Sequence, residues 1–329
     1  MRIFVTGGSG FIGSRLAPLA VQSGHAVTVV TAVNNAAEEA RCAALARAGI
    51  QVVRASLEDA DALSRHLPGH DSVIHLAAAQ HEAGKPESYF HQVNVEGTRR
   101  LLGLAAAAGV QRFVHGSTIG VYGSAAAGSL DEDSPLAPDN PYGRTKAAAE
   151  QVVRAFQGAM QCCIIRISET YGPADMRLLK LFRGVRTGRF LILGQGTNLH
   201  QLIYVDDLAR GLLAACSAAP AAGATIVLAG AEQITTNDMV SAIGAAVGRA
   251  KPVAHAPMWP FLAAATLFEA TFTPVGLKPP LHRRRLDFFA KSFHFSTRRA
   301  QQLLGFEPRT DFVQGARLTA DWYAQHGML

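Results

Sequence analysis

The sequence has few cysteines, few charged residues and no long apolar run. Its four cysteines, among 329 residues, form no Cys-x-x-Cys pair, so we expect small core residues in a reducing, cytoplasmic compartment. The first residues already form a strand, so no secretory leader is expected. The charge-free apolar stretch at 256–268 is shorter than the ~20 residues of a transmembrane helix. It contains two prolines, and we expect a buried or lid helix there, with weak membrane contact as the alternative.

The positive charge of the chain does not indicate nucleic-acid binding. The net charge is +6 at pH 7, but the lysines and arginines are dispersed, apart from the cluster Arg283–Arg285. This cluster predicts either contact with the phosphates of a small molecule or a solvated helix face. We also expect no metal, because five histidines show no metal-ligand spacing and no carboxylates complete a set with them: His70, His75, His81, His91 and His115.

Apolar runs alternate with helical stretches through the first half of the chain. The expected strands are 3–5, 26–31, 51–54, 72–76, 112–116 and 162–167, and the expected helices are 13–23, 35–48, 59–66, 89–108 and 141–156. This alternation predicts an α/β fold with a doubly wound parallel sheet of the Rossmann type. The expected nucleotide-binding domain spans residues 1–172, and the chain returns to it at about 200–229. Within this second segment, Asp206 and Asp207 suit a helix N-cap. A smaller C-terminal α/β substrate domain would comprise 173–199 and 230–329.

A glycine-rich turn follows the first strand. Residues 6–13 read TGGSGFIG, directly after the apolar run Ile3–Val5. Gly7 permits a backbone angle closed to other residues, Gly10 lets the backbone approach a phosphate, and Gly13 lets a helix pack tightly on the strand. The free N–H groups at the start of that helix attract an anion. The pattern therefore predicts a site for a dinucleotide pyrophosphate, with a plain glycine turn as the alternative.

The end of the second strand bears on the choice between NAD and NADP. An acidic residue at that position binds the adenosine ribose and repels a 2′-phosphate. This chain has Thr31, Ala32 and Val33 instead, with no acid before Glu38, and the nearest arginine downstream is Arg41. The sequence therefore predicts NAD(P) as cofactor, with a slight preference for NADP.

Tyr142 and Lys146 are spaced to share one helical face. Pro141 suits the first position of a helix, Asn140 can cap it, and residues i and i+4 are neighbours. Because a nearby ammonium lowers the pKa of a phenol, Tyr142 is predicted to exchange protons near neutral pH. A solvated helix surface is the alternative. A hydroxyl that polarises the substrate oxygen is expected from residues 117–118, at the sheet edge where ligands bind.

Together these motifs resemble the extended short-chain dehydrogenase/reductases, also called the NAD-dependent epimerase/dehydratase family, over nearly the whole chain. The matching segments are 6–13, 75–78, 93–98, 117–123, 141–146, 171–173, 205–209 and 304–308. Residues 194–198 are similar to members related to 3β-hydroxysteroid dehydrogenases. Besides the missing acid, Ser56-Leu57 replaces the family's Asp-Leu, Ile167 replaces a proline, and His200 stands near a position where sugar-nucleotide epimerases often have arginine.

The resemblance implies a role for each of these residues. Tyr142 would exchange the hydroxyl proton, Lys146 would assist it and hold the nicotinamide ribose, and Thr118 would bind the substrate oxygen. The cofactor would contact Gly7, Gly10, Phe11, Ile12, Gly13, Thr31, Ser56, Leu57, Leu76, Ala77, Ala78, Asn94, Ser117, Tyr142 and Lys146. The substrate would contact His81, Thr118, Asn198, His200 and Arg284. Family members often dimerise through two helices, here 89–108 and 141–156, so a homodimer is expected.

Three functions remain open on the sequence. We favour an NAD(P)-dependent oxidoreductase that interconverts a secondary alcohol and a ketone on a bulky, fairly apolar small molecule, with residues 257–277 lining the pocket. The alternative is a nucleoside-diphosphate-sugar 4-epimerase whose NAD is not consumed, which Arg284 and Asp287 support. A non-catalytic NADP-sensing protein is the third possibility, and it fits poorly because Tyr142 and Lys146 are both present.

Overall fold

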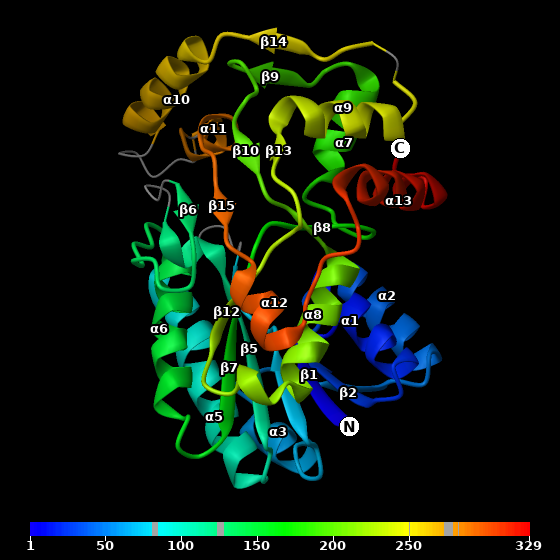
Figure 1. Ribbon diagram of the computed structural model, residues 1–329, viewed down its shortest axis with the longest axis vertical. Helices are drawn as coiled ribbons and strands as arrows, with labels where there is room; N and C mark the ends of the chain where they lie inside the picture. Colours follow the sequence, from blue (N-terminus) through cyan, green and yellow to red (C-terminus); the bar gives the residue numbers. More distant parts are fainter. Residues whose placement is uncertain (81–84, 124–127, 250, 273–278, 282) are drawn as a thin grey trace.

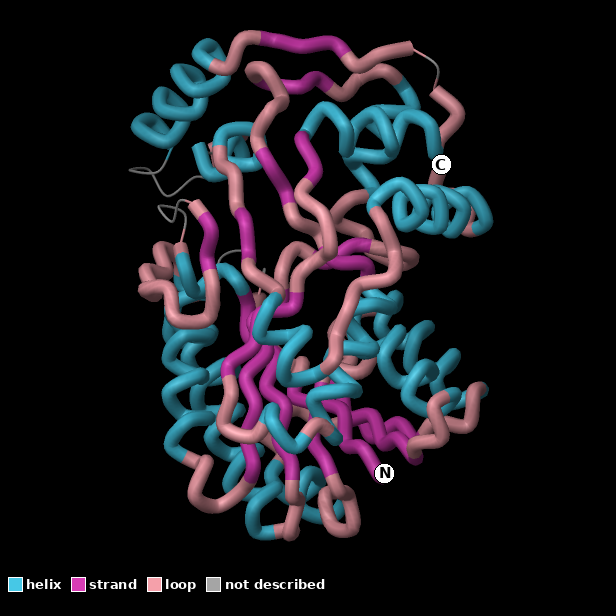
Figure 2. The backbone as a smooth tube through the Cα atoms, in the orientation of Figure 1, coloured by secondary structure: helices cyan, strands magenta, loops and turns pink. Residues whose placement is uncertain are grey.

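A seven-stranded parallel sheet forms the lower part of the molecule (Figures 1 and 2). The computed structural model describes residues 1–80, 85–123, 128–249, 251–272, 279–281 and 283–329. The strand order is β12-β7-β5-β4-β1-β2-β3, and neighbouring strands all run parallel. The bounds are β1 Arg2–Thr6, β2 Ala26–Thr31, β3 Gln51–Arg54, β4 Ser72–His75, β5 Arg112–Thr118, β7 Gln161–Ile167 and β12 Thr225–Leu228. The predicted Rossmann-type α/β fold is therefore confirmed.

Helices bury both faces of this sheet, because successive strand side chains point to opposite sides. Along β1, Ile3 and Val5 belong to one apolar core and Phe4 to the other. One face is covered by α1 Phe11–Gln22, α2 Ala36–Arg47 and α8 Val205–Ser217, and the other by α3 Ala60–His66, α5 Gly97–Ala107 and α6 Pro141–Ala155. The helix expected at 89–108 consists of α4 Glu87–His91, a π-helical turn Gln92–Glu96 and α5.

The upper part of the molecule in Figure 1 consists of helices and short strand pairs. Its helices are α7 Leu179–Thr187, α9 Thr236–Ala246, α10 Trp259–Phe272, α11 Arg283–Ala290 and α13 Phe312–Gln325. The pairs are β9 Leu191–Leu193 with β14 Ala254–Ala256, β10 Leu199–His200 with β13 Ile234–Thr235, β8 Thr170–Tyr171 with β11 Ile203–Tyr204, and β6 Ser129–Leu130 with β15 His294–Phe295. Phe182, Ile243 and Tyr323 join α7, α9 and α13 in a third core. From this part α12 Arg298–Leu304 returns to the sheet and packs on β12.

Two sequence expectations for the second half are corrected by the structure. Asp206 and Asp207 do not cap α8, because the helix begins at Val205 and both carboxylates lie in its first turn. Asp206 instead accepts two hydrogen bonds from Arg15 of α1, at 2.9 and 2.7 Å. Asp207 accepts the backbone N–H groups of residues 309–310. The two carboxylates therefore tie α8 to a neighbouring helix and to the C-terminal segment.

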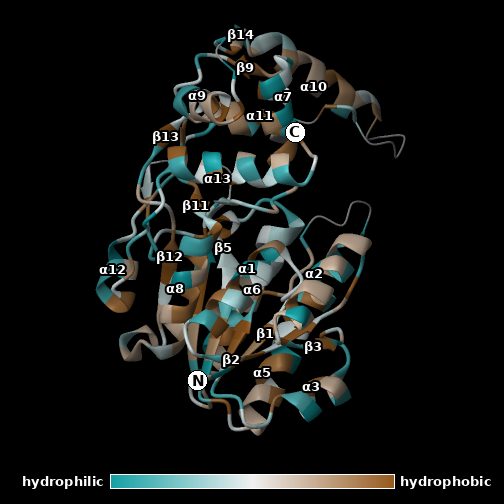
Figure 3. Cartoon of the chain, turned by 90° about the vertical axis from the view of Figure 1, so that its right-hand side faces the viewer, coloured by the Kyte–Doolittle hydropathy of each residue, from teal (hydrophilic) through white to brown (hydrophobic). Residues whose placement is uncertain are grey.

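The helix that contains most of the apolar stretch 256–268 is not buried. Within α10, Trp259 is 73% and Leu267 60% exposed, and Ala265 is its buried residue. Figure 3 shows this helix at the edge of the molecule, coloured mostly toward the hydrophobic end of the scale. The expectation of a buried helix is therefore wrong, whereas a lid role and weak membrane contact at this segment stay predictions. Over the described ranges, no helix is both long enough and apolar enough to cross a membrane.

Candidate active site

The turn between β1 and α1 brings backbone atoms too close together for side chains. Gly7 has a φ of +71°, and a Cβ built on it would lie 2.7 Å from the backbone nitrogen of Ala77. A Cβ on Gly13 would lie 2.5 Å from the carbonyl oxygen of Gly7. Gly10 precedes α1 without a side-chain cap, which leaves the first N–H groups of the helix available to an anion. The turn therefore fits the pyrophosphate of a dinucleotide.

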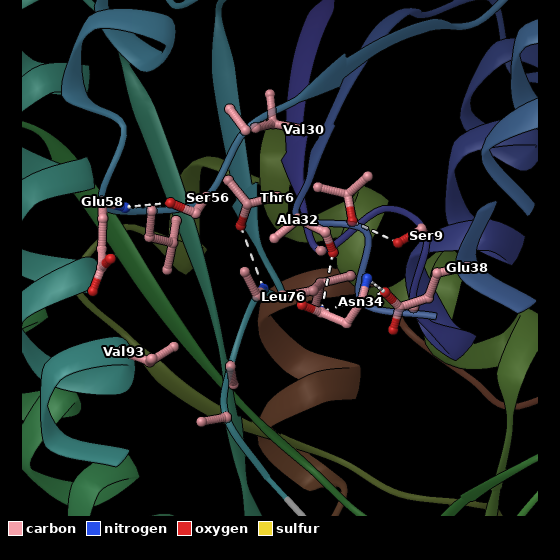
Figure 4. Close-up of a pocket in the computed structure, with 18 of the residues that line it drawn as sticks. Thr6, Ser9, Val30, Ala32, Asn34, Glu38, Ser56, Glu58, Leu76 and Val93 are labelled. Atoms are coloured by element: carbon pink, nitrogen blue, oxygen red, sulfur yellow. Dashed lines mark hydrogen bonds between the residues drawn. The ribbon is translucent and has the colours of Figure 1, made fainter. Parts of the chain in front are cut away.

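A cavity of about 320 Å³ lies beside this turn, at the ends of the first strands (Figure 4). It is lined by eight of the residues predicted to contact a cofactor: Gly7, Gly10, Thr31, Ser56, Leu57, Leu76, Ala77 and Ala78. Its walls combine small apolar side chains with hydroxyl groups and exposed backbone. We refer to it as the adenosine cavity, because it continues from the pyrophosphate turn toward β2 and β3.

Glu38 brings a carboxylate into the adenosine cavity, which sequence reasoning missed. The residue lies in the first turn of α2, where its N–H bonds to the side chain of the N-cap Asn35. Its Oε2 accepts the backbone N–H of Asn34 at 2.8 Å, and Figure 4 shows this contact close to Ala32. The loop after β2 therefore returns an acid to the strand end that the sequence leaves without one. Such an acid opposes the 2′-phosphate of NADP.

Two further cavities meet at the predicted catalytic hydroxyl groups. The second, of about 490 Å³, runs from the glycine turn to the ends of β5 and β7 and is lined by Phe11, Ile12, Gly13 and Ser117, among others. The third, of about 390 Å³, opens toward α11 and β15. Both are lined by Gln80, Thr118, Ile119, Tyr142, Glu169 and Arg177. Thr118 and Tyr142 therefore lie where a cofactor in one cavity and a substrate in the other would come together.

Tyr142 stands at the start of α6, where the sequence predicted it. Asn140 caps this helix by accepting the N–H of Gly143 at 3.0 Å. Burial raises the pKa of Tyr142 to about 12, and a hydrogen bond with Thr118 acts in the opposite direction. The predicted lowering of the phenol pKa by Lys146 is therefore absent in this arrangement, because burial disfavours the phenolate more than its surroundings favour it.

Lys146 lies one turn after Tyr142, behind the cavity wall. Its side chain is buried, and its Nζ lies 3.1 Å from Nε2 of His115 on β5. Burial lowers the pKa of Lys146 to about 7, while the charge of Glu150 raises it. Contact with the nicotinamide ribose stays a prediction for this residue.

Ser117 and Asn94 support the site from behind. The Ser117 hydroxyl donates to Glu150 Oε1 at 2.6 Å, and this glutamate is fully buried. The Asn94 amide exchanges two hydrogen bonds with the backbone of Ala79 and donates a third to the Thr145 hydroxyl. These contacts fix the segment after β4 and the helix α6 relative to one another.

The structure places the residues predicted to contact substrate in different surroundings. His200 lines the third cavity, and its Nε2 lies 2.9 Å from the hydroxyl of Thr236. Asn198 donates to the carbonyl oxygen of Phe288 at 2.7 Å, which gives it a structural contact. His81 and the side chain of Arg284 lie outside the described residues.

Several charged and aromatic side chains of the third cavity were not found from the sequence. They are Arg177, Glu169, Phe288, Lys291, Phe293 and Phe295, whereas Asp287, which the sequence had linked to the sugar-nucleotide alternative, also lines this cavity. Glu169 follows β7 and lies 3.7 Å from the His200 ring, whereas Asp287 and Lys291 pair with each other at 3.1 Å. Among the residues missed, Glu169 offered a signal in the sequence, because it lies two residues after the end of β7, at the sheet edge where ligands bind.

The arrangement suits hydride transfer beside an acid–base group. A phenol and a hydroxyl can hold one substrate oxygen where the second and third cavities meet. Within the described ranges no group of three His, Cys, Asp or Glu side chains could hold a metal ion.

Comparison with known proteins finds relatives that match nearly the full length of the chain. It is 31% identical to dTDP-glucose 4,6-dehydratase of Streptomyces niveus, over 98% of this chain and 93% of that protein. It is 28% identical to 2-alkyl-3-oxoalkanoate reductase of Stenotrophomonas maltophilia, over 96% and 98%. The structure of UDP-glucuronic acid 4-epimerase from Bacillus cereus in complex with NAD superposes with a TM-score of 0.80 at 25% identity, over 99% of both chains.

These relatives refine the resemblance seen in the sequence. Dehydratases and epimerases of nucleotide sugars match over nearly the full length, so a particular kinship with 3β-hydroxysteroid dehydrogenases is not what they indicate. Residues 3–229, which include the glycine turn, Tyr142 and the last strand of the sheet, match the model of a single enzyme family. The chain belongs to the NAD dependent epimerase/dehydratase family.

Proposed function

We propose that the protein acts on a nucleoside-diphosphate sugar, oxidising a ring hydroxyl with bound NAD and later returning the hydride to the same molecule. The observation that carries this proposal is the placement of Thr118 and Tyr142 between the cofactor cleft and a charged cavity. Arg177, Lys291 and His200 line that cavity and suit the phosphates and hydroxyl groups of such a substrate. The favoured sequence interpretation, a bulky apolar alcohol, is less well supported by the relatives.

Each hydroxyl group has a defined task in this proposal. NAD supplies the hydride acceptor when it is bound. Tyr142 and Thr118 hold the substrate oxygen between them, and the phenolate form of Tyr142 takes the hydroxyl proton as the carbonyl forms. When hydride returns, Tyr142 gives the proton back. Lys146, one turn away on α6, provides positive charge behind the phenol.

A carboxylate favours a dehydratase as the second candidate beside the epimerase. Loss of water next to a carbonyl needs a group that moves a proton at a neighbouring carbon. Glu169 is, among the described residues, the acid that lines both the second and the third cavity. Ile119 and Gly120, which follow Thr118 and also line the third cavity, have no titratable side chain and so cannot move this proton. An epimerase needs no such acid, so the product identifies which candidate is right.

The proposed function predicts turnover without consumption of cofactor. The protein is incubated with catalytic NAD and, separately, with dTDP-glucose, UDP-glucose and UDP-glucuronic acid. We expect one of them to be converted over many turnovers while the absorbance band of reduced nicotinamide stays flat. Proton NMR of the product distinguishes a 4-epimer from a 4-keto-6-deoxy sugar. Stoichiometric formation of NADH or NADPH with an apolar secondary alcohol, and no change in the sugars, would overturn the proposal.

Glu38 leads us to propose NAD as the cofactor. Its carboxylate lines the adenosine cavity, where a 2′-phosphate would meet like charge. For Glu38→Gln we expect the Kd of NADPH to fall about tenfold, with little change for NADH, because one charge repulsion of about 1.4 kcal/mol is removed. Fluorescence titration of both cofactors measures the ratio.

The neighbouring Glu39 provides a matched control for this substitution. Its carboxylate pairs with Arg54 and does not line the adenosine cavity. Glu39→Gln should therefore leave the ratio of the two dissociation constants unchanged. If wild-type protein already binds NADPH more tightly than NADH, the role given to Glu38 is wrong.

A further inference from the structure

We propose that His115 is the positioning residue of Lys146: it accepts one N–H of the ammonium and thereby keeps the lysine charged and directed toward Tyr142 and the cofactor. The proposal rests on the function proposed above for Lys146, which is to provide positive charge behind the phenol of Tyr142. Its geometric basis is the 3.1 Å contact between Lys146 Nζ and His115 Nε2, with both side chains buried. In the described part of the chain, His115 is the hydrogen-bond partner of this ammonium.

The surroundings of the pair decide which group carries the charge. His75 on β4 packs against His115 with ring centroids 5.3 Å apart. Burial holds the pKa of His75 down to about 3 and that of His115 well below its usual range, so both rings stay neutral. On α6, Glu150 is engaged by Arg166 of β7. Of the three neighbouring bases His75, His115 and Lys146, the lysine is therefore the one that takes up a proton near neutral pH.

The hydrogen bonds around the two rings assign different tautomers to them. Thr98 donates to the carbonyl oxygen of Asn94 at 2.7 Å, so it accepts from Nε2–H of His75 at 2.9 Å. Nδ1 of the same ring then accepts from the Thr6 hydroxyl at 2.7 Å. For His115 the ammonium occupies Nε2, which places the ring proton on Nδ1.

His115 Nδ1 is one of the buried side-chain atoms without a hydrogen-bond partner in the described structure. A buried donor left unpaired costs about 1–3 kcal/mol. Unlike His75, whose two nitrogens are both satisfied, His115 contributes little to the fold through its polar atoms. The cost is understandable if its task is to present Nε2 to Lys146. An ammonium has three N–H groups, so fixing one on β5 also restricts the direction of the other two.

The pairing is tested without substrate by nitrogen-15 NMR of histidine-labelled, cofactor-free protein. The His115 signals are assigned from their absence in His115→Gln. We expect a neutral ring protonated on Nδ1, and a change of tautomer in Lys146→Met, because the ring then loses its donor. A wild-type ring protonated on Nε2, or a tautomer unaffected by Lys146→Met, would refute the pairing. This outcome is independent of whether any sugar nucleotide is turned over.

The consequence for the site is tested by NADH binding as a function of pH. If the ammonium is needed, affinity is full below the pKa of Lys146 and declines as the pH rises through it. In His115→Leu the charged form loses its acceptor, so the onset of this decline should move about one to two pH units lower. In His115→Gln the amide oxygen still accepts, and the onset should stay near that of the wild type.

A purely structural histidine would behave differently. His70→Gln serves as the control, because His70 is also buried and bonds to Leu67 and Thr28 at the opposite end of the sheet from the cavities. It should leave the onset in place even if stability falls. Equal weakening of NADH binding at every pH in both His115 variants, with no movement of the onset, would overturn the role assigned to this residue.

Discussion

Replacing Tyr142 with phenylalanine is expected to lower kcat by about 10²- to 10⁴-fold while the Kd of NADH stays within a few-fold of the wild type. The ring remains and continues to fill the junction of the two cavities, so only the proton-transfer group is lost. Burial raises its pKa to about 12 and keeps the phenol protonated in the cofactor-free protein. Oxidation of the substrate therefore requires the phenolate, which the positive charge of bound NAD would favour. Steady-state kinetics on the converted sugar nucleotide and an NADH titration together measure the two effects.

Tyr204→Phe provides the control for this prediction. Burial raises the pKa of Tyr204 to about 12 as well, but this residue lies in the third apolar core and lines neither cavity beside Thr118. This substitution should leave kcat within a few-fold. If Tyr142→Phe retains activity at that level, the phenol is not the acid–base group and the mechanism proposed above is wrong.

Replacing Glu150 with glutamine is expected to lower the free energy of unfolding by about 3–5 kcal/mol. Glu150 is fully buried and accepts two hydrogen bonds from Arg166, at 3.1 and 2.9 Å, and one from Ser117. The guanidinium of Arg166 is itself 2% exposed, so the substitution leaves a buried charge without its counter-ion. Urea unfolding at neutral pH measures the loss, and activity should fall with it because Ser117 shares the site.

An exposed pair of the same geometry serves as the control. Arg144 binds both carboxylate oxygens of Glu87, at 2.8 and 2.6 Å, but these side chains are 44% and 48% exposed. Glu87→Gln should lower the free energy of unfolding far less than Glu150→Gln, because water solvates and screens both charges of the exposed pair. Equal losses for Glu150→Gln and Glu87→Gln would show that burial does not strengthen the first pair.

The buried pair also makes a prediction about pH. Burial by itself would raise the pKa of Glu150, but the hydrogen bonds and charge of Arg166 dominate, and the folded-state pKa is lowered. A carboxylate whose pKa is lowered by folding stabilises the protein at pH values above its unfolded-state pKa of ~4.3. This stabilisation is lost as the pH falls through the folded-state pKa. The difference in stability between wild type and Glu150→Gln should therefore shrink in acid.

The sequence was sufficient for features that depend on neighbouring residues. The glycine turn, the start of α6 at Pro141 and the carboxyl end of β5 were all predicted, because each rests on local backbone geometry. The alternation of strands and helices determined the sheet for the same reason. A helical spacing also placed Tyr142 and Lys146 on one helix, although it did not show where the ammonium points.

Features made by distant segments were beyond the sequence. The acid for the adenosine cavity comes from Glu38, because the loop after β2 folds back over the strand end. The third cavity combines the end of β7 with residues 287–295, which lie more than a hundred positions later. The partner of Lys146 is His115 on β5, 31 positions earlier, and no sequence pattern predicts a contact between a histidine and a lysine at that separation.

The edge strand β12 links the folding of the lower part of the molecule to that of the upper part. It is synthesised only after the segments that form α7 and α8, yet it completes the sheet beside β7. Its free edge is shielded by Glu132, which accepts the N–H of Val227 at 2.8 Å, and by α12 from the C-terminal region. No single cut divides such a chain into a self-sufficient nucleotide module and a remainder, so during synthesis the sheet stays incomplete until β12 has emerged.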